Sequence, residues 1–493
     1  MLFDKLTKEL EGEVIFGEGN PDITSLVYDS RKIEPGCIFV CIKGANFDGH
    51  DAAKEAFEKG ACAIVVEHEV DITPGDIPGG TPIIYKTPDT RLALALLSAA
   101  WFDHPASSLK VIGITGTKGK TTTTYMIKSI LENAGIPTGL IGTIEAIIGD
   151  KRIPALNTTP ESYVIQEYFA MMRDEGLKAV VMEVSSQGLM LKRTEGFIFD
   201  IGIFTNLEED HIGPNEHSSF DDYVYCKSLL FKQCRLGLVN TDDPLWERVL
   251  KDHTCDVLTY GFSEKADYRA CDVSYTNDAG VLGVKYNVEG RRNITARVSI
   301  PGDFTVYNSL CAIAVCDRFN VSDDDILSAL LSAKVKGRIE PLDVPGNYSL
   351  MIDYAHNAMS LKSLITSLRH YDIKRLVVLF GCGGNRSKTR RFEMGEIAGN
   401  MADFTIITSD NPRNEDPMDI INDIETGMKK TNGLYIKIPD RKEAIRYAMK
   451  EALDGDVIIL AGKGHEDYQE ICGVKHHMDE RELVADIIRE EGM

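Results

Sequence analysis

The chain has 493 residues, more than one hydrophobic core usually supports, so we expect two to four domains. Hydrophobic residues make up 43% and charged residues 26%, a composition typical of a soluble globular protein. The 54 basic and 76 acidic residues give a formal net charge of −22, which argues against nucleic acid or an anionic membrane as the main partner. Any anionic substrate must therefore be held by locally placed basic groups and backbone amides.

Residues 1–107 are predicted to form a small α/β domain, because short β-branched runs alternate with helical segments. The N-terminal residues lack the apolar segment of a signal peptide, and no later run approaches a membrane span. Cys37 and Cys41 come closest to a metal-ligand pair, but their alternation with Ile38 and Val40 indicates buried strand thiols. This cysteine usage indicates a reducing compartment, so we expect a cytoplasmic protein without membrane insertion.

A second domain is predicted over residues 108–337, where an apolar strand at 111–114 runs directly into GTKGKTTTT. The first glycine of the usual phosphate-loop spacing is missing, because Ile114 stands at that position. A Gly-rich turn that opens a helix still presents successive N–H groups to phosphate oxygens. We predict that Lys120 reaches the β- and γ-phosphates of a nucleotide and that Thr121 offers its hydroxyl to Mg²⁺. The predicted loop residues are Gly116, Thr117, Lys118, Gly119, Lys120, Thr121 and Thr122.

Two further strands are predicted to end in polar clusters beside this loop. MEVSSQ places Glu183 at one strand end, and TNLEEDH places Asp210 and His211 at another. The carboxyl ends of strands in a doubly wound parallel sheet meet at one edge, where ligands bind. Alone, such a residue is more often a helix cap than a metal ligand. Because Mg²⁺ prefers oxygen, Thr121 and Glu183 are stronger candidates than His211.

A third α/β domain is predicted over residues 338–493. Glycine and proline punctuate residues 334–356, after which RLVVLFGCGGNR, DFTIITSDNPRNEDP and DVIILAGKGHEDYQ each show an apolar strand opening into a charged loop. The predicted fold class is therefore α/β, with a central parallel-sheet P-loop domain and a C-terminal Rossmann-like domain.

These segments together resemble the ATP-dependent Mur ligases of peptidoglycan synthesis, whose loop has the shorter GTxGKT spacing. The matching segments include DSRKIEPGCIFVCIKG, GTKGKTTTT, NTTPES, MEVSSQGL, TNLEEDH, YCKSLLF, KGRIEP, DYAH, FGCGGNR, SDNPRNEDP and GKGHEDYQ. The resemblance implies a three-domain ligase in which ATP phosphorylates a carboxylate and an amine attacks the resulting acyl phosphate. Within the family, the set is similar to members that add the third residue to UDP-N-acetylmuramoyl-L-alanyl-D-glutamate.

The resemblance also implies roles that the residues alone do not indicate. Asn308 and Arg338 match groups near ATP, and Asp353 and His356 match groups beside ATP and the reacting centre. Lys227 matches a lysine that CO₂ carbamylates in the family, which converts a cation into an anion able to hold a second Mg²⁺. Without the resemblance, Lys227 would be interpreted as a surface charge on a helix capped by Ser219. The implied catalytic residues are Lys120, Glu183, His211, Lys227 and His356, and the implied metal ligands are Thr121, Glu183, His211 and carbamylated Lys227.

Contacts to the UDP-linked substrate are implied for hydroxyl, amide and basic side chains of the first two domains. These residues are Ser30, Arg31, Asn157, Thr158, Thr159, Ser185, Gln187 and Arg193. The sequence departs from the common family pattern at Lys118, where asparagine is usual, and at Gln187, where histidine is usual.

The third domain is predicted to choose the amine. SDNPRNEDP places Arg413 after an apolar strand, and a guanidinium fork suits a carboxylate and repels an ammonium. The distal end of meso-diaminopimelate carries both groups, whereas lysine presents only the ammonium. DNPR is the pattern of family members specific for diaminopimelate. The implied amino-acid contacts are Arg391, Asp410, Asn411, Arg413, Gly462 and Glu466, with Glu466 accepting from the distal ammonium.

Three alternative functions stay open. The protein could be a Mur-type ligase for L-lysine or another amine, a nucleotide-dependent binding protein, or a phosphotransferase without an amine site. Arg413 argues against lysine, and the charged clusters of the third domain argue against a non-ligase. We expect ATP, Mg²⁺, a UDP-linked dipeptide and diaminopimelate as small-molecule partners of a monomer that binds no nucleic acid.

Overall fold

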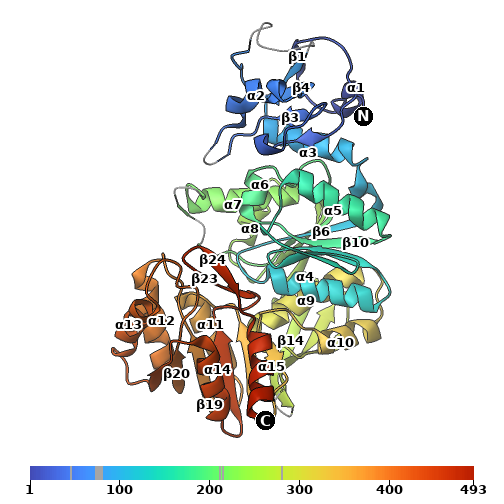
Figure 1. Cartoon of the computed structure of the whole chain (residues 1–493). Coiled ribbons are helices and arrows are strands. Elements are labelled where there is room, and N and C mark those ends of the chain that lie inside the picture. Colours follow the sequence, from blue (N-terminus) through green and yellow to red (C-terminus); the bar gives the residue numbers. More distant parts are fainter. Residues whose placement is uncertain (45–46, 73–81, 210–211, 214–215, 279–280, 493) are drawn as a thin grey trace. The chain divides into compact units, whose positions relative to one another are not determined.

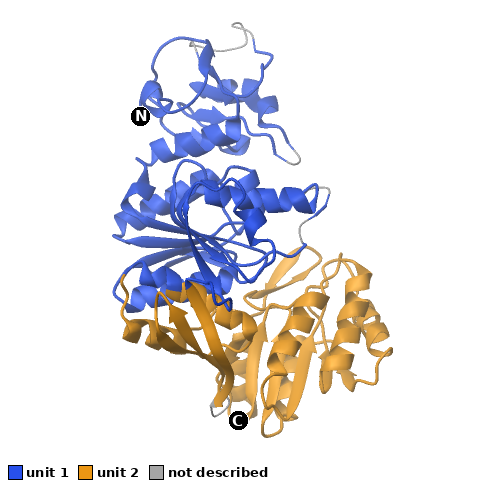
Figure 2. Cartoon of the chain, turned by 180° about the vertical axis from the view of Figure 1, so that it is seen from behind, with its two compact units in different colours: residues 1–267, 314–319 blue, residues 268–313, 320–493 orange. Residues whose placement is uncertain are grey.

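The computed structural model describes residues 1–44, 47–72, 82–209, 212–213, 216–278 and 281–492, and the chain divides into two compact units. Unit 1 comprises residues 1–267 with 314–319, and unit 2 comprises residues 268–313 with 320–493 (Figure 2). Among the described helices, none combines the length and apolar composition needed to cross a bilayer. All eleven cysteines are free thiols, and Cys37 and Cys41 are buried at the two ends of strand β3, just outside its bounds.

The N-terminal part of unit 1 is a small sheet with the order β1-β5-β4-β3-β2, in which only β1 runs antiparallel to its neighbour (Figure 1). Strands β2 to β5 are largely buried because helices and loops cover the sheet, whereas the edge strand β1 is mostly exposed. Helix α3 packs against α5 of the following region. The strands are β1 (Glu13–Phe16), β2 (Leu26–Val27), β3 (Ile38–Val40), β4 (Ala63–Val66) and β5 (Ile83–Lys86). The helices are α1 (Phe3–Leu6), η1 (Ser30–Lys32), η2 (Gly49–Ala52), α2 (Ala53–Glu58), α3 (Thr90–Trp101) and η4 (Pro105–Ser108).

The central sheet of unit 1 has the order β13-β12-β11-β6-β10-β7-β8-β9. The strands from β13 to β7 pair in parallel, and β8 and β9 add an antiparallel edge. The order puts the ends of β6, β10 and β11 side by side, as predicted. The strands are β6 (Lys110–Thr115), β7 (Thr138–Ile141), β8 (Glu145–Ile148), β9 (Lys151–Pro154), β10 (Ala179–Glu183), β11 (Phe199–Phe204), β12 (Cys234–Asn240) and β13 (Asp256–Gly261). The helices are α4 (Lys120–Asn133), α5 (Ser162–Asp174), α6 (Ser186–Met190), α7 (Phe220–Ser228), η5 (Leu229–Lys232) and α8 (Trp246–Val249).

Unit 2 contains an antiparallel ladder of β14, β15 and β16 and a sheet with the order β17-β18-β22-β19-β20-β21. The second sheet is parallel except for β17, and β22 is buried along its whole length. The strands are β14 (Tyr268–Asp278), β15 (Val281–Gly290), β16 (Ile294–Val298), β17 (Glu340–Leu342), β18 (Ser349–Asp353), β19 (Arg375–Phe380), β20 (Phe404–Ile407), β21 (Tyr435–Lys437), β22 (Asp456–Ala461), β23 (Tyr468–Ile471) and β24 (Val474–His477). The helices are α9 (Asp303–Asp317), whose last residues belong to unit 1, α10 (Asp323–Ser332), α11 (Ala358–Leu368), α12 (Lys388–Met401), α13 (Pro417–Met428), α14 (Arg441–Lys450) and α15 (Glu480–Glu491).

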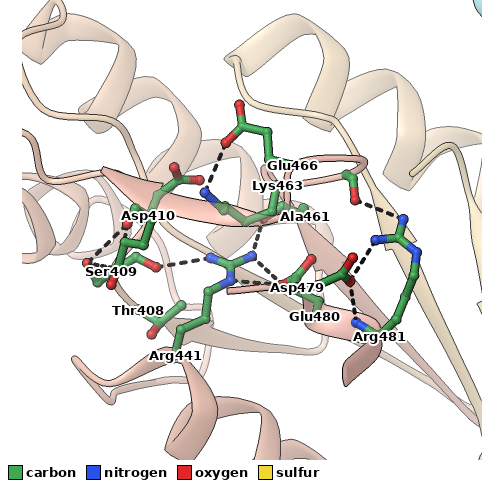
Figure 3. Close-up of polar contacts among 12 residues, drawn as sticks. Thr408, Ser409, Asp410, Arg441, Ala461, Lys463, Glu466, Asp479, Glu480 and Arg481 are labelled. Atoms are coloured by element: carbon green, nitrogen blue, oxygen red, sulfur yellow. Dashed lines mark hydrogen bonds and ion pairs between the residues drawn. The ribbon is translucent and has the colours of Figure 1, made fainter. Parts of the chain in front are cut away.

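A buried ion pair joins the first residues of α14 and α15 to the ends of two strands (Figure 3). The Arg441 and Glu480 side chains are 1% and 0% exposed, and Arg441 Nε donates to Glu480 Oε1 at 2.8 Å. The same guanidinium donates to the carbonyl oxygens of Ser409 and Ala461 at 3.1 and 3.0 Å. Arg441 therefore fixes the loops that follow β20 and β22, which carry the predicted amino-acid contacts.

Replacing Arg441 by methionine should lower the free energy of unfolding by about 3–5 kcal/mol, because it leaves the Glu480 carboxylate buried without its cation. Replacing both Arg441 and Glu480 by apolar residues should cost much less, since no uncompensated charge remains. Denaturant unfolding measures both effects. The control is Arg489→Met, which breaks an exposed pair with Asp486 and should cost less than about 1 kcal/mol. Equal losses of unfolding free energy for Arg441→Met and Arg489→Met would contradict the view that burial makes the Arg441–Glu480 pair important for stability.

Candidate active site

The Gly-rich loop connects β6 to α4 through backbone conformations that favour glycine. Gly116 has φ 149° and Gly119 has φ 86°. A Cβ atom at Gly116 would lie 2.0 Å from Thr205 Oγ1, so the loop passes too close to its neighbour for a side chain. Lys120 Nζ folds back onto the loop and donates to the carbonyl oxygens of Gly116 and Thr117 at 2.7 and 3.1 Å. The loop thus has the strand-turn-helix form in which helix N-termini bind phosphate.

Glu183 lies at the end of β10 directly beside this loop and is 1% exposed. Its carboxylate accepts hydrogen bonds from Thr121 Oγ1 at 3.0 and 3.1 Å. It also accepts from the backbone N–H of Thr143 at 2.9 Å and from Thr143 Oγ1 at 3.0 Å. A carboxylate and two hydroxyls are the kind of oxygen ligands that Mg²⁺ takes, so the cluster fits that ion chemically. Thr143 follows β7 and carries no sequence signal that pointed to it.

Lys227 is buried, in contrast to the solvated charge that its helix alone would suggest. It lies in the last turn of α7 with 1% exposure, and its Nζ donates to Gly116 O at 2.9 Å. The same Nζ lies 4.5 Å from the ring centre of Tyr223, whose hydroxyl is 3.2 Å from Thr117 Oγ1. The predicted cap is confirmed, since Ser219 accepts from the N–H of Asp222. Asp210 and His211 lie outside the described residues.

A buried histidine links α6 to α7 and was missed from sequence. His217 is 0% exposed, and its Nε2 lies 2.8 Å from Ser186 Oγ. Its Nδ1 lies 3.4 Å from Asp222 Oδ2 near the start of the helix that carries Lys227. His217 lies ten positions before Lys227 and ahead of the start of α7. Nothing in this spacing predicted that its side chain would contact Ser186 and Asp222.

A cavity of about 330 Å³, named here the Thr159 cavity, brings several predicted residues to the loop. Thr159 Oγ1 donates to Glu183 O at 3.0 Å and accepts from Ser185 N at 2.9 Å, and Arg193 donates to Thr159 O at 3.0 Å. These bonds tie the NTTPES segment to the end of β10. The cavity is lined by Lys120, Thr143, Leu156, Asn157, Thr158, Thr159, Ser185, Ser186, Gln187 and Arg193.

Ser30 and Arg31 do not line the Thr159 cavity. They belong to η1, after β2, where the 86%-exposed Arg31 side chain pairs with Asp29. The guanidinium holds the pKa of the Asp29 carboxyl at about 2. Asn308 is buried on α9 in unit 2.

The end of β18 gathers a second set of predicted residues within unit 2. Asp353 is buried and accepts from the backbone N–H groups of Ile339 and Ala355 at 2.9 and 2.8 Å. Burial raises the pKa of this carboxyl, and the Arg338 guanidinium opposes the rise. The Arg338 guanidinium carbon lies 4.9 Å from the ring centre of Tyr354, and His356 Nδ1 lies 2.8 Å from Tyr354 O. The arrangement keeps a cation and an imidazole together at the strand end.

A second cavity, of about 260 Å³ and named here the Arg413 cavity, opens at the ends of β19, β20 and β22. Arg413 has φ 52°, and its side chain donates to Glu470 at 3.1 Å and to Gly384 O at 2.7 Å. The cavity contains groups of both charges, as recognition of a zwitterion requires. It is lined by Tyr354, His356, Gly381, Gly383, Arg386, Arg390, Asp410, Asn411, Arg413, Gly462 and Glu466.

Arg391 does not line the Arg413 cavity, although it was predicted to contact the amino acid. Its side chain is 0% exposed on α12 and donates to both oxygens of Glu415, at 2.7 and 2.8 Å, and to Asp423 at 3.0 Å. The next residue back, Arg390, lines the cavity instead. The resemblance to the family pointed to Arg391, the buried one of these two arginines. A match between sequences does not show which of the two side chains faces the cavity.

Comparisons with known proteins agree with this geometry. The family model described as Mur ligase family, catalytic domain, matches residues 22–100. The Mur ligase middle domain matches 114–316, and the Mur ligase glutamate ligase domain matches 337–464. A UDP-N-acetylmuramoyl-L-alanyl-D-glutamate--2,6-diaminopimelate ligase of Caldanaerobacter subterraneus subsp. tengcongensis is 43% identical over 97% of both chains. One of the same name from Clostridium perfringens is 42% identical over 99% of both. The chain belongs to the Mur ligase family.

Solved Mur ligase structures share the whole architecture of the chain. A UDP-N-acetylmuramoyl-L-alanyl-D-glutamate--2,6-diaminopimelate ligase aligns over 96% of both chains with a TM-score of 0.71 and 26% identity. The MurF of Acinetobacter baumannii aligns over 99% of this chain and 98% of its own, with a TM-score of 0.61 and 19% identity, and shares the fold. The predicted α/β fold class and the predicted membership of the Mur ligases are both confirmed.

Replacing Glu415 of this Mur ligase by glutamine should weaken the fold above about pH 4.5 and have little effect near pH 2. The Arg391 guanidinium lowers the pKa of Glu415 from its ordinary value of 4.5 to about 2. The stability due to this charge is present above the unfolded-state pKa and is lost as the pH falls through the folded-state pKa. Denaturant unfolding across this pH range measures the difference between wild type and variant, which should shrink on acidification. A difference independent of pH would contradict the ionised pair.

Proposed function

We propose that this Mur ligase joins meso-2,6-diaminopimelate to UDP-N-acetylmuramoyl-L-alanyl-D-glutamate, with ATP as the phosphoryl donor, in peptidoglycan synthesis. The observation that carries the proposal is the Arg413 cavity, which is lined by both the Arg413 guanidinium and the Glu466 carboxylate. Such a pair matches the carboxylate and the ammonium at the distal end of diaminopimelate. Relatives bearing this activity in their names, 43% and 42% identical over nearly the whole chain, support the same substrate.

The chemistry assigned to the loop is activation of a carboxylate. The carboxylate attacks the γ-phosphorus of ATP, and ADP leaves, so that the poor electrophile becomes an acyl phosphate. Loop N–H groups and Lys120 hold the phosphates and neutralise developing charge, after Lys120 gives up its bonds to Gly116 and Thr117. Thr121, Glu183 and carbamylated Lys227 would hold Mg²⁺, which supplies further positive charge at the transferring phosphoryl group. His211, which lies outside the described residues, belongs to the proposed set because of the resemblance alone.

The amine then attacks the acyl carbon, and phosphate leaves. Residues of the Thr159 cavity are proposed to orient the muropeptide carboxylate, and Ser30 and Arg31 to bind the uridine end. Asn308, Arg338, Asp353 and His356 are proposed to act at ATP and the reacting centre. The residues 1–107, 108–337 and 338–493 serve as UDP-substrate, ATP and amino-acid domains. We propose that the protein acts as a monomer in the cytoplasm, a compartment that the free thiols support.

The direct test is phosphate release from ATP in the presence of the UDP-linked dipeptide. Release should require diaminopimelate, with little release for lysine or without amine, because lysine lacks the distal carboxylate that Arg413 recognises. Product mass identifies the amide. Activity with lysine alone would replace the proposal by the lysine-adding alternative, and nucleotide hydrolysis without amide formation would favour a nucleotide-dependent binding protein.

Changing Arg413 to alanine should raise the KM for diaminopimelate about ten- to a hundredfold, the effect of losing one or two charge-assisted hydrogen bonds. The KM values for ATP and for the UDP-linked dipeptide should stay within about twofold of wild type. Arg489→Ala is the control, because this arginine is 76% exposed and pairs only across one helix turn with Asp486. An unchanged KM for diaminopimelate would make Arg413 a bystander.

Changing Lys227 to arginine should lower kcat by at least about a hundredfold, because a guanidinium stays protonated and forms no carbamate. Wild-type activity should also fall in CO₂-depleted buffer and return on addition of bicarbonate. Labelling with ¹³C-bicarbonate should give a carbamate signal in the wild type that the variant lacks. Lys232→Arg is the control, since this neighbouring lysine of η5 is exposed. Full activity of Lys227→Arg would remove the carbamate from the mechanism.

A further inference from the structure

A fully buried lysine lies behind the wall of the Arg413 cavity and does not line it. Lys463 follows β22, and its side chain is 0% exposed. Its Nζ donates to Asn411 Oδ1 at 2.9 Å, to Glu466 Oε2 at 2.9 Å and to the carbonyl oxygen of Tyr468. An ammonium has three N–H donors, and here each has an oxygen. Lys463 is therefore committed to these three protein groups and has no donor left for a ligand.

The Lys463 contacts fix two side chains that line the cavity, Asn411 and Glu466. Asn411 Oδ1 accepts from Lys463 and from the N–H of Glu470 at 2.9 Å, which sets the orientation of the amide. Its Nδ2 then donates to Glu466 Oε2 at 2.9 Å. Glu466 Oε2 thus accepts two hydrogen bonds, and among the described residues no donor is recorded for Oε1. Figure 3 shows Lys463 extended toward the Glu466 carboxylate from the strand end.

The same ammonium changes the charge that a ligand meets. Three guanidinium groups line the cavity, those of Arg386, Arg390 and Arg413, against the carboxylates of Asp410 and Glu466, and Glu470 pairs with Arg413 from outside the lining. Because Lys463 pairs with Glu466 Oε2 at 2.9 Å, the attraction of that carboxylate for a cation is weakened, while Oε1 can still accept from the ammonium of a zwitterionic ligand. A net positive wall disfavours an amine that brings only an ammonium, and tolerates one that brings a carboxylate as well.

We propose that Lys463 is a positioning and specificity-determining residue of the amino-acid site. It holds Asn411 and Glu466 in place for the distal end of the amine, and it lowers the affinity of the cavity for a purely cationic amine such as lysine. The inference rests on the proposed function and deepens it, because it gives discrimination against lysine a second source besides Arg413. A purely structural lysine would affect stability and all substrates alike.

The test compares Lys463→Met with the control Lys475→Met. Lys475 lies on β24, is exposed, and places its Nζ 3.9 Å from the ring centre of Tyr468 without contacting Asn411 or Glu466. Steady-state kinetics are measured for ATP, the UDP-linked dipeptide, diaminopimelate and lysine. Lys463→Met should raise the KM for diaminopimelate at least about tenfold and leave the other two KM values within about twofold. The ratio of kcat/KM for diaminopimelate to that for lysine should fall at least about tenfold.

Two further variants separate charge from placement and keep the test decisive if Lys463→Met folds poorly. Lys463→Gln removes the charge but keeps a hydrogen-bonding group, and should show the same fall in the selectivity ratio. Lys463→Arg keeps the charge but not the three-point geometry, and should raise the KM with the ratio near wild type. KM values and this ratio do not depend on how much of a sample is folded.

The possible outcomes distinguish a failure of the proposed function from a failure of the proposed role of Lys463. A wild-type enzyme that does not use diaminopimelate would refute the proposed function itself. The wild-type enzyme could prefer diaminopimelate while Lys463→Met and Lys463→Gln leave unchanged both the KM for diaminopimelate and the ratio of kcat/KM for diaminopimelate to that for lysine. This result would overturn only the role of Lys463. A fall in kcat alone, equal for both amines and without a change in KM, would also overturn it.

Discussion

Polar and charged groups that are buried near the ends of the parallel strands need hydrogen-bonding partners, and this constraint organises both sheets. A strand such as β22 is buried along its length and apolar after its first residue, so polar groups appear only at its ends, close to the strands beside it. There Glu183 bonds two threonines, Lys227 bonds the loop carbonyl of Gly116, and Lys463 bonds three oxygens. A protein with a net charge of −22 can in this way present cationic groups and N–H donors to anionic ligands.

Both sheets gather polar groups at the ends of their parallel strands, but these groups are suited to different chemistry. In unit 1, the Gly-rich loop between β6 and α4 and the buried Glu183 carboxylate bring together N–H donors suited to phosphate and oxygen ligands suited to a divalent cation. In unit 2, the loops after β20 and β22 carry amide, carboxylate and guanidinium groups suited to a zwitterion. Arg441 reaches both of these loops through Ser409 and Ala461, so the recognition surface is anchored to the helix starts beneath it (Figure 3).

Hydrophobic runs that end in polar clusters sufficed to predict the parallel sheets and their edges, whereas most of the predicted residues that line the cavities came from the resemblance to the family. Position along the chain did not reveal burial. Lys227 would pass for a surface charge from its helix, and only the fold shows it pointing at Gly116. The same limit applies to Arg390 and Arg391, adjacent in sequence but on different sides of the cavity wall. Thr143, His217 and Lys463 each also make a contact with a residue 40, 31 and 52 positions away, respectively, and no local pattern encodes these distant contacts.

The inward fold of Lys120 has a consequence for how nucleotide comes and goes. Its ammonium already bonds two loop carbonyls, so an arriving phosphate exchanges internal partners for new ones and gains only the difference. That exchange would lower the affinity of the loop for the proposed nucleotide, and the same two carbonyls could accept from Lys120 again once ADP had left. In the proposed reaction, the loop carbonyls therefore compete with the nucleotide for the Lys120 ammonium, which favours release of ADP over its retention.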